Sequence, residues 1–307
     1  MAKARELKRR IRSISSTRQI TKTMEMVATS RLKKAQDRVV AARPYAAALA
    51  EVIGDLYAPE LAERFPLLRR PGEDGAAPKR TALVLITSNR GLCGAFNANL
   101  IREARRRLQE LEGQGTAVEL HLVGKKGVAY FRFTRREAAS QRIDIGDRPT
   151  PERAAEVITP LMTRFARGEL DAVEIVFAKF NSPMSTPPTV LTVLPIAPPP
   201  VPHPLAPSPH RGEGERGRGT LRFYILKPSA DAILAALLPL YVNNQMYRAL
   251  VETAAGEHGA RCTAMKNATD NAGDILDTLR RTFNRARQAQ ITQELAEIVG
   301  GAEALKG

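Results

Sequence analysis

The sequence has no tryptophan, and aromatic residues make up only 5% of its 307 positions. A packed core in this chain must therefore consist mainly of Ala, Leu, Ile, Val and Met side chains. Cysteine is scarce as well. Cys93 and Cys262 lie far apart and belong to no CxxC pair, so neither a disulfide framework nor a thiolate metal site is indicated. This usage is typical of a reducing compartment.

Long apolar runs are also missing. The longest candidate, residues 233–242, has about ten apolar residues and contains Pro239, whereas a membrane span needs about 18. The first residues, MAKARELKRR, lack the apolar region of a secretory signal, so we expect no cleaved leader.

Positive charge is what the sequence has in excess. There are 47 Lys and Arg against 32 Asp and Glu, a formal net charge of +15. The excess is concentrated at the front, since residues 1–57 carry 13 basic and 5 acidic side chains, whereas residues 230–307 carry 8 and 9. Such a balance favours nucleic acid, an anionic membrane surface or acidic proteins as partners.

A seven-residue repeat of apolar and small side chains runs through the first segment, as in a coiled coil. A helix over residues 4–57 would be roughly 80 Å long, so its partner should lie elsewhere in this chain. The alanines in the repeat predict a close approach of the two helices, and Pro44 is a position where the helix can bend or break. One line of the repeat comprises Leu7, Ile14, Thr21, Ala28, Ala35, Ala42, Leu49 and Leu56, and the other Ile11, Leu32, Val39, Ala46 and Ile53.

The partner is predicted at the other end of the chain. Ser229 can cap a helix that continues to about residue 305, although Gly256, Gly259 and Gly273 lower its intrinsic propensity. Two such helices at opposite ends of one chain predict an antiparallel coiled coil. The repeat in this helix comprises Met265, Thr269, Ala272, Leu276, Leu279, Phe283, Ala286 and Gln290, and then shifts to Ile291, Leu295 and Ile298.

Between the helices, strand and helix patterns alternate, which predicts a small Rossmann-like domain. The fold class is therefore α/β, with N- and C-terminal helices in a long antiparallel coiled coil. The predicted division is 1–58, 79–226 and 229–305, with a disordered Pro/Gly-rich insertion at 197–219. Strands are predicted over 81–87, 118–124, 172–180, 189–196 and 221–226, and helices over 97–111 and 150–168, the second capped by Thr150.

No stretch predicts a convincing catalytic, cofactor or metal site. Gly212, Gly214 and Gly217 spell GxGxxG, but neither flank is a strand or helix. The loop SNRGLCGAFN at 88–97 follows a strand and precedes a helix, where phosphate binders sit, yet it lacks the GxxxxGK[ST] pattern; a structural turn is the favoured interpretation and a ligand loop the alternative.

The individual Cys, His and Asp side chains do not predict a catalytic or metal site either. Cys93 as a nucleophile would need a base, for which His121 is the candidate, but a packed thiol is the simpler interpretation. The four histidines show no ligand spacing. Asp270, Asp274 and Asp277 recur on a helix face without matching a calcium loop, so we interpret them as solvated charges.

Apolar residues leave the repeat near both chain ends, at 20–27 and 289–299. A helix that is apolar on several faces must be surrounded. Either a third helix of this chain covers it, or a sleeve of other subunits encloses this end, where flexible methionines such as Met24 and Met26 suit a contact that re-packs.

Three stretches resemble the gamma subunits of F-type, proton-translocating ATP synthases. They are QITKTMEMVATSRLKKAQDRVVAARPYA at 19–46, the loop at 88–97, and MKNATDNAGDILDTLRRTFNRARQAQITQELAEIVGGAEAL at 265–305. The resemblance covers nearly the whole chain in the same order. It implies a central rotor stalk without a catalytic site of its own, which couples transmembrane proton flow to ATP synthesis or hydrolysis.

The resemblance also implies partners and contact residues. The coiled coil would turn inside a ring of three alpha and three beta subunits, and the base would sit on the c-ring beside the epsilon subunit, on the cytoplasmic face of a bacterial inner membrane. Tyr224 matches the foot, while Lys227 replaces an acidic residue found in many relatives. The insertion has no cysteine, so the thiol control of chloroplast relatives is not expected. Matches to the contacts with beta are Arg261, Arg287, Gln288 and Thr292, with Met24 facing them from the first helix.

Two other functions remain as alternatives from the residues alone. A nucleic-acid-binding coiled coil would use the basic first helix and bind DNA with a steep salt dependence. An α/β enzyme would use the loop at 88–97 and bind nucleotide by itself.

Overall fold

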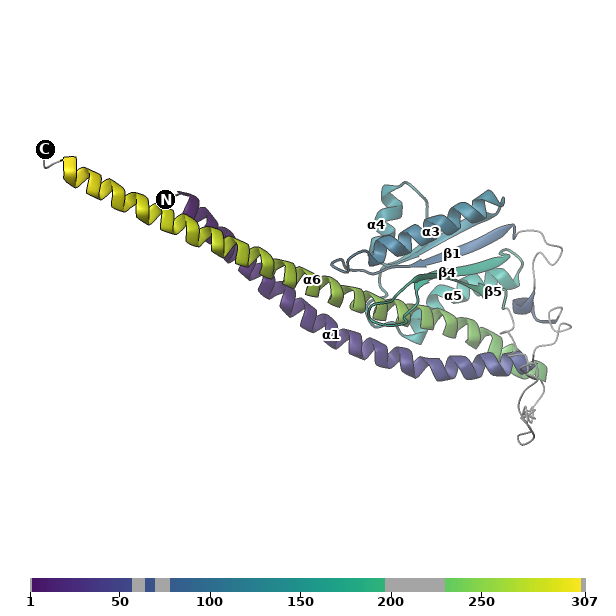
Figure 1. The fold of residues 1–307 in the computed structure, drawn as a ribbon. Coiled ribbons are helices and arrows are strands. Elements are labelled where there is room, and N and C mark those ends of the chain that lie inside the picture. The colour runs from purple at the N-terminus through teal and green to yellow at the C-terminus, as the bar shows by residue number, and fades with distance from the viewer. Residues whose placement is uncertain (1, 57–63, 70–77, 197–229, 305–307) are drawn as a thin grey trace, which may run out of the picture. The chain divides into compact units, whose positions relative to one another are not determined.

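The computed structural model describes residues 2–56, 64–69, 78–196 and 230–304, which form two compact units. The coiled-coil unit comprises Met1–Leu32, Leu92–Gly94 and His258–Gly307, and the α/β unit comprises Lys33–Gly91 and Ala95–Glu257. The two terminal helices, α1 (Ala2–Leu56) and α6 (Ala230–Ala304), contribute to both units (Figure 1). Neither is interrupted, although α1 contains Pro44 and α6 contains Pro239.

In the coiled-coil unit, α1 and α6 pair in antiparallel. The hydroxyl oxygens of Thr21 and Thr269 lie 2.8 Å apart, and Thr29 Oγ1 lies 3.2 Å from Cys262 Sγ, so the residue number rises along one helix as it falls along the other. Ala28 and Leu32 on α1 and Met265, Ala272 and Leu276 on α6 are buried, as the heptad pattern predicts. Small side chains at this seam let the helices approach closely.

In the α/β unit, a five-stranded sheet has the order β3-β2-β1-β4-β5. The first four strands run parallel and β5 is antiparallel to β4. Its strands are β1 (Arg80–Ile86), β2 (Ala117–Val123), β3 (Ser140–Arg142), β4 (Ala172–Ala178) and β5 (Pro188–Leu194). This sheet and the terminal helices confirm the expected fold class.

Helices cover both faces of the sheet, which explains why β1 and β4 are nearly continuous apolar runs. Ala82, Val84 and Ile86 share one core with residues of α5 (Pro151–Ala166), α6 and α1, including Phe165, Val242 and Ile53. Leu83 and Leu85 alternate to the other face, where α3 (Phe96–Gly113) and α4 (Lys125–Phe133) lie. A short helix, η1 (Pro66–Leu68), adds Leu68 to the first core.

Several local features follow from the sequence. Thr150 Oγ1 accepts a hydrogen bond from the Arg153 amide at 3.4 Å and caps α5, with Pro151 at its first position. Gly256 lies against Phe96, Thr186 and Ala178, and a Cβ there would be 3.1 Å from the Phe96 ring. The glycine that lowers helix propensity therefore lets α6 pack closely against these side chains.

Four features differ from the sequence expectation or lie outside the described residues. Helix α4 and strand β3 were not predicted. The predicted strand at 221–226 and the predicted insertion at 197–219 lie outside the described residues. In the described part of the chain, no helix combines the length and apolar character that a bilayer span requires.

Candidate functional site

The loop after β1 occupies the position where α/β proteins often bind ligands, but its polar groups are used within the protein. The Ser88 amide donates to Asn97 Oδ1 at 3.0 Å, Asn97 Nδ2 donates to Ser88 Oγ at 2.8 Å, and Ser88 Oγ donates to the Arg90 carbonyl at 2.6 Å. These bonds close the turn on itself.

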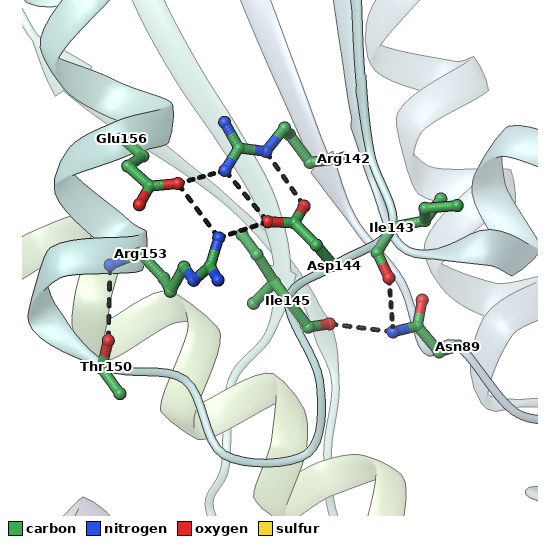
Figure 2. Close-up of polar contacts among 8 residues, drawn as sticks. All are labelled: Asn89, Arg142, Ile143, Asp144, Ile145, Thr150, Arg153 and Glu156. Carbon is green, nitrogen blue, oxygen red and sulfur yellow. Dashed lines mark hydrogen bonds and ion pairs between the residues drawn. The ribbon is translucent and has the colours of Figure 1, made fainter.

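Asn89 joins three segments that are distant in sequence. Its Nδ2 donates to the carbonyls of Ile145 at 2.9 Å and Ile143 at 3.2 Å, as Figure 2 shows, and its Oδ1 accepts from the Lys125 amide at 2.9 Å. One amide side chain therefore ties the loop after β1 to the start of α4 and to the loop after β3.

The N-terminus of α4 has no amide left for a phosphate. Its first three N–H groups, those of Lys125, Lys126 and Gly127, donate to Asn89 Oδ1, the Ser88 carbonyl at 3.1 Å and Thr87 Oγ1 at 2.9 Å. A helix N-terminus binds phosphate through such free donors. The cavity beside this loop has a volume of about 20 Å³, room for about one water molecule. These contacts support the interpretation of a structural turn.

A charged cluster beside the loop is self-neutralised (Figure 2). Arg142 binds Asp144 and Glu156, and Arg153 Nη1 lies 2.6 Å from Asp144 Oδ2. The hydrogen bond from Arg142 holds the pKa of Asp144 below its ordinary value, and the same contact raises the pKa of Arg142. The cluster fastens the loop after β3 to the first turn of α5.

The other candidate reactive groups are also accounted for. His121 Nδ1 lies 2.7 Å from Ser140 Oγ, and Cys93 and His121 belong to different units. Among the residues that the structure describes, no group of three or more His, Cys, Asp or Glu side chains is placed to hold a metal ion. Asp270, Asp274 and Asp277 are exposed.

The coiled-coil unit instead presents apolar side chains to solvent. Ile20, Met26 and Val27 on α1 are about half exposed. On α6 the exposed apolar residues lie near the C-terminal end, and from Ile291 to Gly301 every residue is exposed. The four large ones there are Ile291, Leu295, Ile298 and Val299, with exposures of 48% to 67%.

The helix register explains this exposure. Because Thr21 lies beside Thr269, residues of α6 after about 289 extend past the first residue of α1, as Figure 1 shows at the yellow end of α6. This last part of α6 is a single helix with an apolar stripe. A stripe of this size on a lone helix requires a cover.

The predicted contact residues are distributed along this unit. Arg261 is buried and its Nη1 donates to His258 Nδ1 at 3.3 Å. Arg287, Gln288 and Thr292 are exposed, and Thr292 Oγ1 donates to the Gln288 carbonyl at 3.1 Å. Tyr224 lies outside the described residues.

Met24 is half-buried and lies three residues beyond Thr21, which places it opposite residues 266–267 of α6. At 1.5 Å per residue, that point is about 8 Å along the helix from Arg261 but about 30 Å from Arg287. The expectation that Met24 faces Arg287, Gln288 and Thr292 is therefore not met.

A buried ion pair was missed by the sequence reasoning. Glu174, in the middle of β4, is buried and accepts hydrogen bonds from Arg107 of α3 at 2.6 and 2.7 Å. These bonds raise the pKa of Arg107. The signal was the single carboxylate in the apolar run AVEIVFA, because a charge inside a buried strand needs a partner.

Comparison with known proteins gives a consistent result over the full length. A family model described as ATP synthase matches residues 3–305. The chain is 61% identical to the ATP synthase gamma chain of Gemmatimonas aurantiaca and 45% identical to that of Moorella thermoacetica, in each case over 100% of both chains.

Two solved structures share the fold. A chain of the Euglena gracilis mitochondrial ATP synthase assembly of OSCP, F1 and c-ring matches with a TM-score of 0.66 and 21% identity, over 99% of this chain and 95% of that one. A chain of the Tetrahymena thermophila central stalk and c-ring matches with a TM-score of 0.56 and 23% identity, over 81% and 99%.

Proposed function

This chain belongs to the ATP synthase gamma-chain family, and we propose that its coiled-coil unit, including the unpaired C-terminal end of α6, is the surface through which it drives the other subunits. Its function is that of the central rotor stalk. It couples transmembrane proton flow to ATP synthesis or hydrolysis in an alpha and beta ring. The relatives that match over their full length are ATP synthase gamma chains. This match supports neither the DNA-binding alternative nor the alternative of an independent enzyme.

The observation that carries the proposal is the apolar surface at the end of the coiled-coil unit. Ile, Leu and Val side chains on this unpaired helix are exposed to water. Covering them with a partner stabilises the complex by about 25 cal/mol per Å² of apolar surface buried. A ring of three alpha and three beta subunits around the α6 end provides such a cover. This favours the sleeve interpretation over a third helix of the same chain.

The polar residues of this unit suit contacts with the enclosing loops. Arg287, Gln288 and Thr292 are exposed side chains that can bond carboxylates and carbonyls of the beta subunits. Met24 and Arg261 would contribute at the paired part of the unit, about 30 Å or more along α6 from Arg287, and Arg261 is buried within the chain. Because the shaft presents different residues to each beta subunit, it shifts each site's equilibrium differently as it turns.

The remaining assignments complete the proposal. We propose that the catalytic chemistry belongs to the ring subunits and that this chain acts on it as a non-catalytic subunit. The base, with Tyr224, contacts the c-ring and the epsilon subunit, and the protein is peripheral to the cytoplasmic face of a bacterial inner membrane. The solved neighbours are chains of assemblies whose titles name F1, the central stalk and the c-ring.

The test is reconstitution with alpha and beta subunits, followed by an ATPase assay of the complex with and without this chain. A stable complex whose activity depends on the chain is expected. In membrane vesicles that contain the complete synthase, Met24→Lys should lower ATP-driven proton pumping while the chain remains folded, whereas Met184→Lys, at an exposed position of the α/β unit, should not. Failure to form a complex under any condition would remove the proposal.

A further inference from the structure

Helix α4 carries a positively charged surface that the proposed rotor contacts do not use. Residues 125–136 include five Lys and Arg and no Asp or Glu. Lys125, Lys126, Arg132 and Arg135 are exposed, and none of these four has an ion pair among the described residues. Arg136 alone is paired, with Glu112 of α3. The excess charge is therefore not neutralised within the described part of the chain.

An exposed aromatic side chain lies within this charge. Phe133, the last residue of α4, is 85% exposed, while Val128 and Phe131 on the inner face are buried. Phe133 shares the outer face with Lys126 and Tyr130, since residues three, four and seven apart lie on one side of a helix. A phenyl ring left in water is an anchor that a partner can bury.

Helix α3 extends the surface. Arg102 and Arg105 are exposed and one turn apart, and Arg105 Nη1 donates to Tyr130 Oη at 3.1 Å. The Tyr130 ring packs edge to face on Phe131, with centroids 5.3 Å apart, which fixes the position of that hydroxyl. Arg105 of α3 is thus held against α4 by a defined contact, and Tyr130 lies one turn from Phe133.

We propose that this α3–α4 basic surface, formed by Arg102, Arg105, Lys126, Arg132, Phe133 and Arg135, docks an acidic segment of a partner protein with an apolar side chain that packs on Phe133. Carboxylates would neutralise the guanidinium and ammonium groups around the ring. The proposal goes beyond the rotor role, because none of the rotor contact residues lies on these two helices.

The combination of one aromatic anchor and surrounding arginines favours a protein partner. Aromatic residues and Arg are enriched where protein interfaces are centred. Single-stranded nucleic acid is bound by several aromatic platforms in succession, and here Tyr130 is occupied by Arg105. A single phenyl ring is also a small anchor for an anionic membrane surface.

The experiment uses the full chain and a fluorescein-labelled peptide of glutamates that flank one leucine and one phenylalanine, with binding followed by fluorescence anisotropy. The same peptide with glutamine in place of glutamate is the ligand control. We expect the double variant Arg132→Glu with Arg135→Glu to weaken binding about tenfold or more, and Phe133→Ser to weaken it about fivefold.

Matched variants on the same unit separate this surface from the general positive charge. Arg167→Glu with Lys179→Glu reverses two exposed cations elsewhere, and Met184→Ser removes another exposed apolar side chain, so both should bind like the original chain. Equal losses in test and control variants would overturn the proposal. So would tighter binding of single-stranded DNA or anionic vesicles that does not depend on Phe133.

Discussion

Gly124 shows how a single residue fixes the turn between β2 and α4. Its φ is +101°, and an added Cβ would lie 2.1 Å from the Thr87 carbonyl oxygen. That carbonyl belongs to the backbone and cannot rotate away. The glycine is therefore required by both conformation and space.

Gly124→Ala should lower the free energy of unfolding of the α/β unit by about 3 kcal/mol, because strain and backbone overlap act together. Chemical denaturation of the full chain, followed by circular dichroism, measures the change. Gly113→Ala is the matched control, since an added Cβ there meets nothing within 4 Å. Equal stability of the Gly124→Ala chain would show that the turn can rearrange.

His121 gives the α/β unit a pH dependence. Burial lowers the pKa of His121 below its ordinary value of 6.5, although Glu119, with Oε2 3.9 Å from Nε2, acts in the opposite direction. Arg164 also lies near and lowers it. The unfolded chain therefore takes up a proton more readily than the folded one, and stability is lost as the pH falls below about 6.5.

His121→Gln should remove the contribution of this histidine to the pH dependence of the free energy of unfolding. In the original chain the free energy of unfolding should fall between about pH 6.5 and 5, and the variant should be flatter over this range. The pKa values of Glu119, Asp144 and Glu103 are all lowered by their arginine partners, so these groups titrate below the range. Parallel slopes in both proteins would contradict the assignment.

At the scale of elements, the sequence predicted the helices and strands that have a clear hydrophobic pattern. The repeat in α1 gave the buried seam from Ala28 to Ile53, and continuous apolar runs gave β1 and β4. It missed β3, whose three residues Ser-Gln-Arg have no apolar member and join the sheet through backbone hydrogen bonds. It missed α4 because the helix is short and begins with two lysines and a glycine.

The sequence predicted the position of the candidate site between a strand and a helix. It did not predict the contacts that its side chains make. The loop at 88–97 follows a strand and precedes a helix as predicted, but the partners of Asn89 lie 36 to 56 residues away. No local pattern specifies such contacts. The position of Met24 along α6 likewise depends on helix register, which the heptad repeat alone does not set to within a turn.

The close approach of α1 and α6 can be tested at Ala28, which is buried at the seam. Ala28→Leu should destabilise the helix pair by about 1–3 kcal/mol, because the extra methylenes have no space between the helices. Ser30→Leu, two residues away at an exposed position, should change stability little. Thermal unfolding followed at 222 nm compares them, and equal behaviour would mean that the seam is loosely packed.

At the scale of the whole molecule, the end of α6 links the fold to assembly. Residues 291–301 have no part of α1 opposite them and are all exposed. The end of a helix that no other described segment covers opens locally at low free-energy cost, so we expect partners that cover this stretch to stabilise it. By contrast, residues 265–276 include buried seam positions at Met265, Ala272 and Leu276.

Hydrogen exchange separates the two regions. In the isolated chain, amides of 291–301 should exchange far faster than those of 265–276, because nothing in the described chain covers the last turns of α6. Addition of alpha and beta subunits should slow exchange at 291–301 by at least about tenfold, as the apolar stripe becomes buried. Leu295→Asp should reduce that protection without changing exchange at 265–276. Protection that appears in the complex only outside 291–301 would mean that another surface holds the ring.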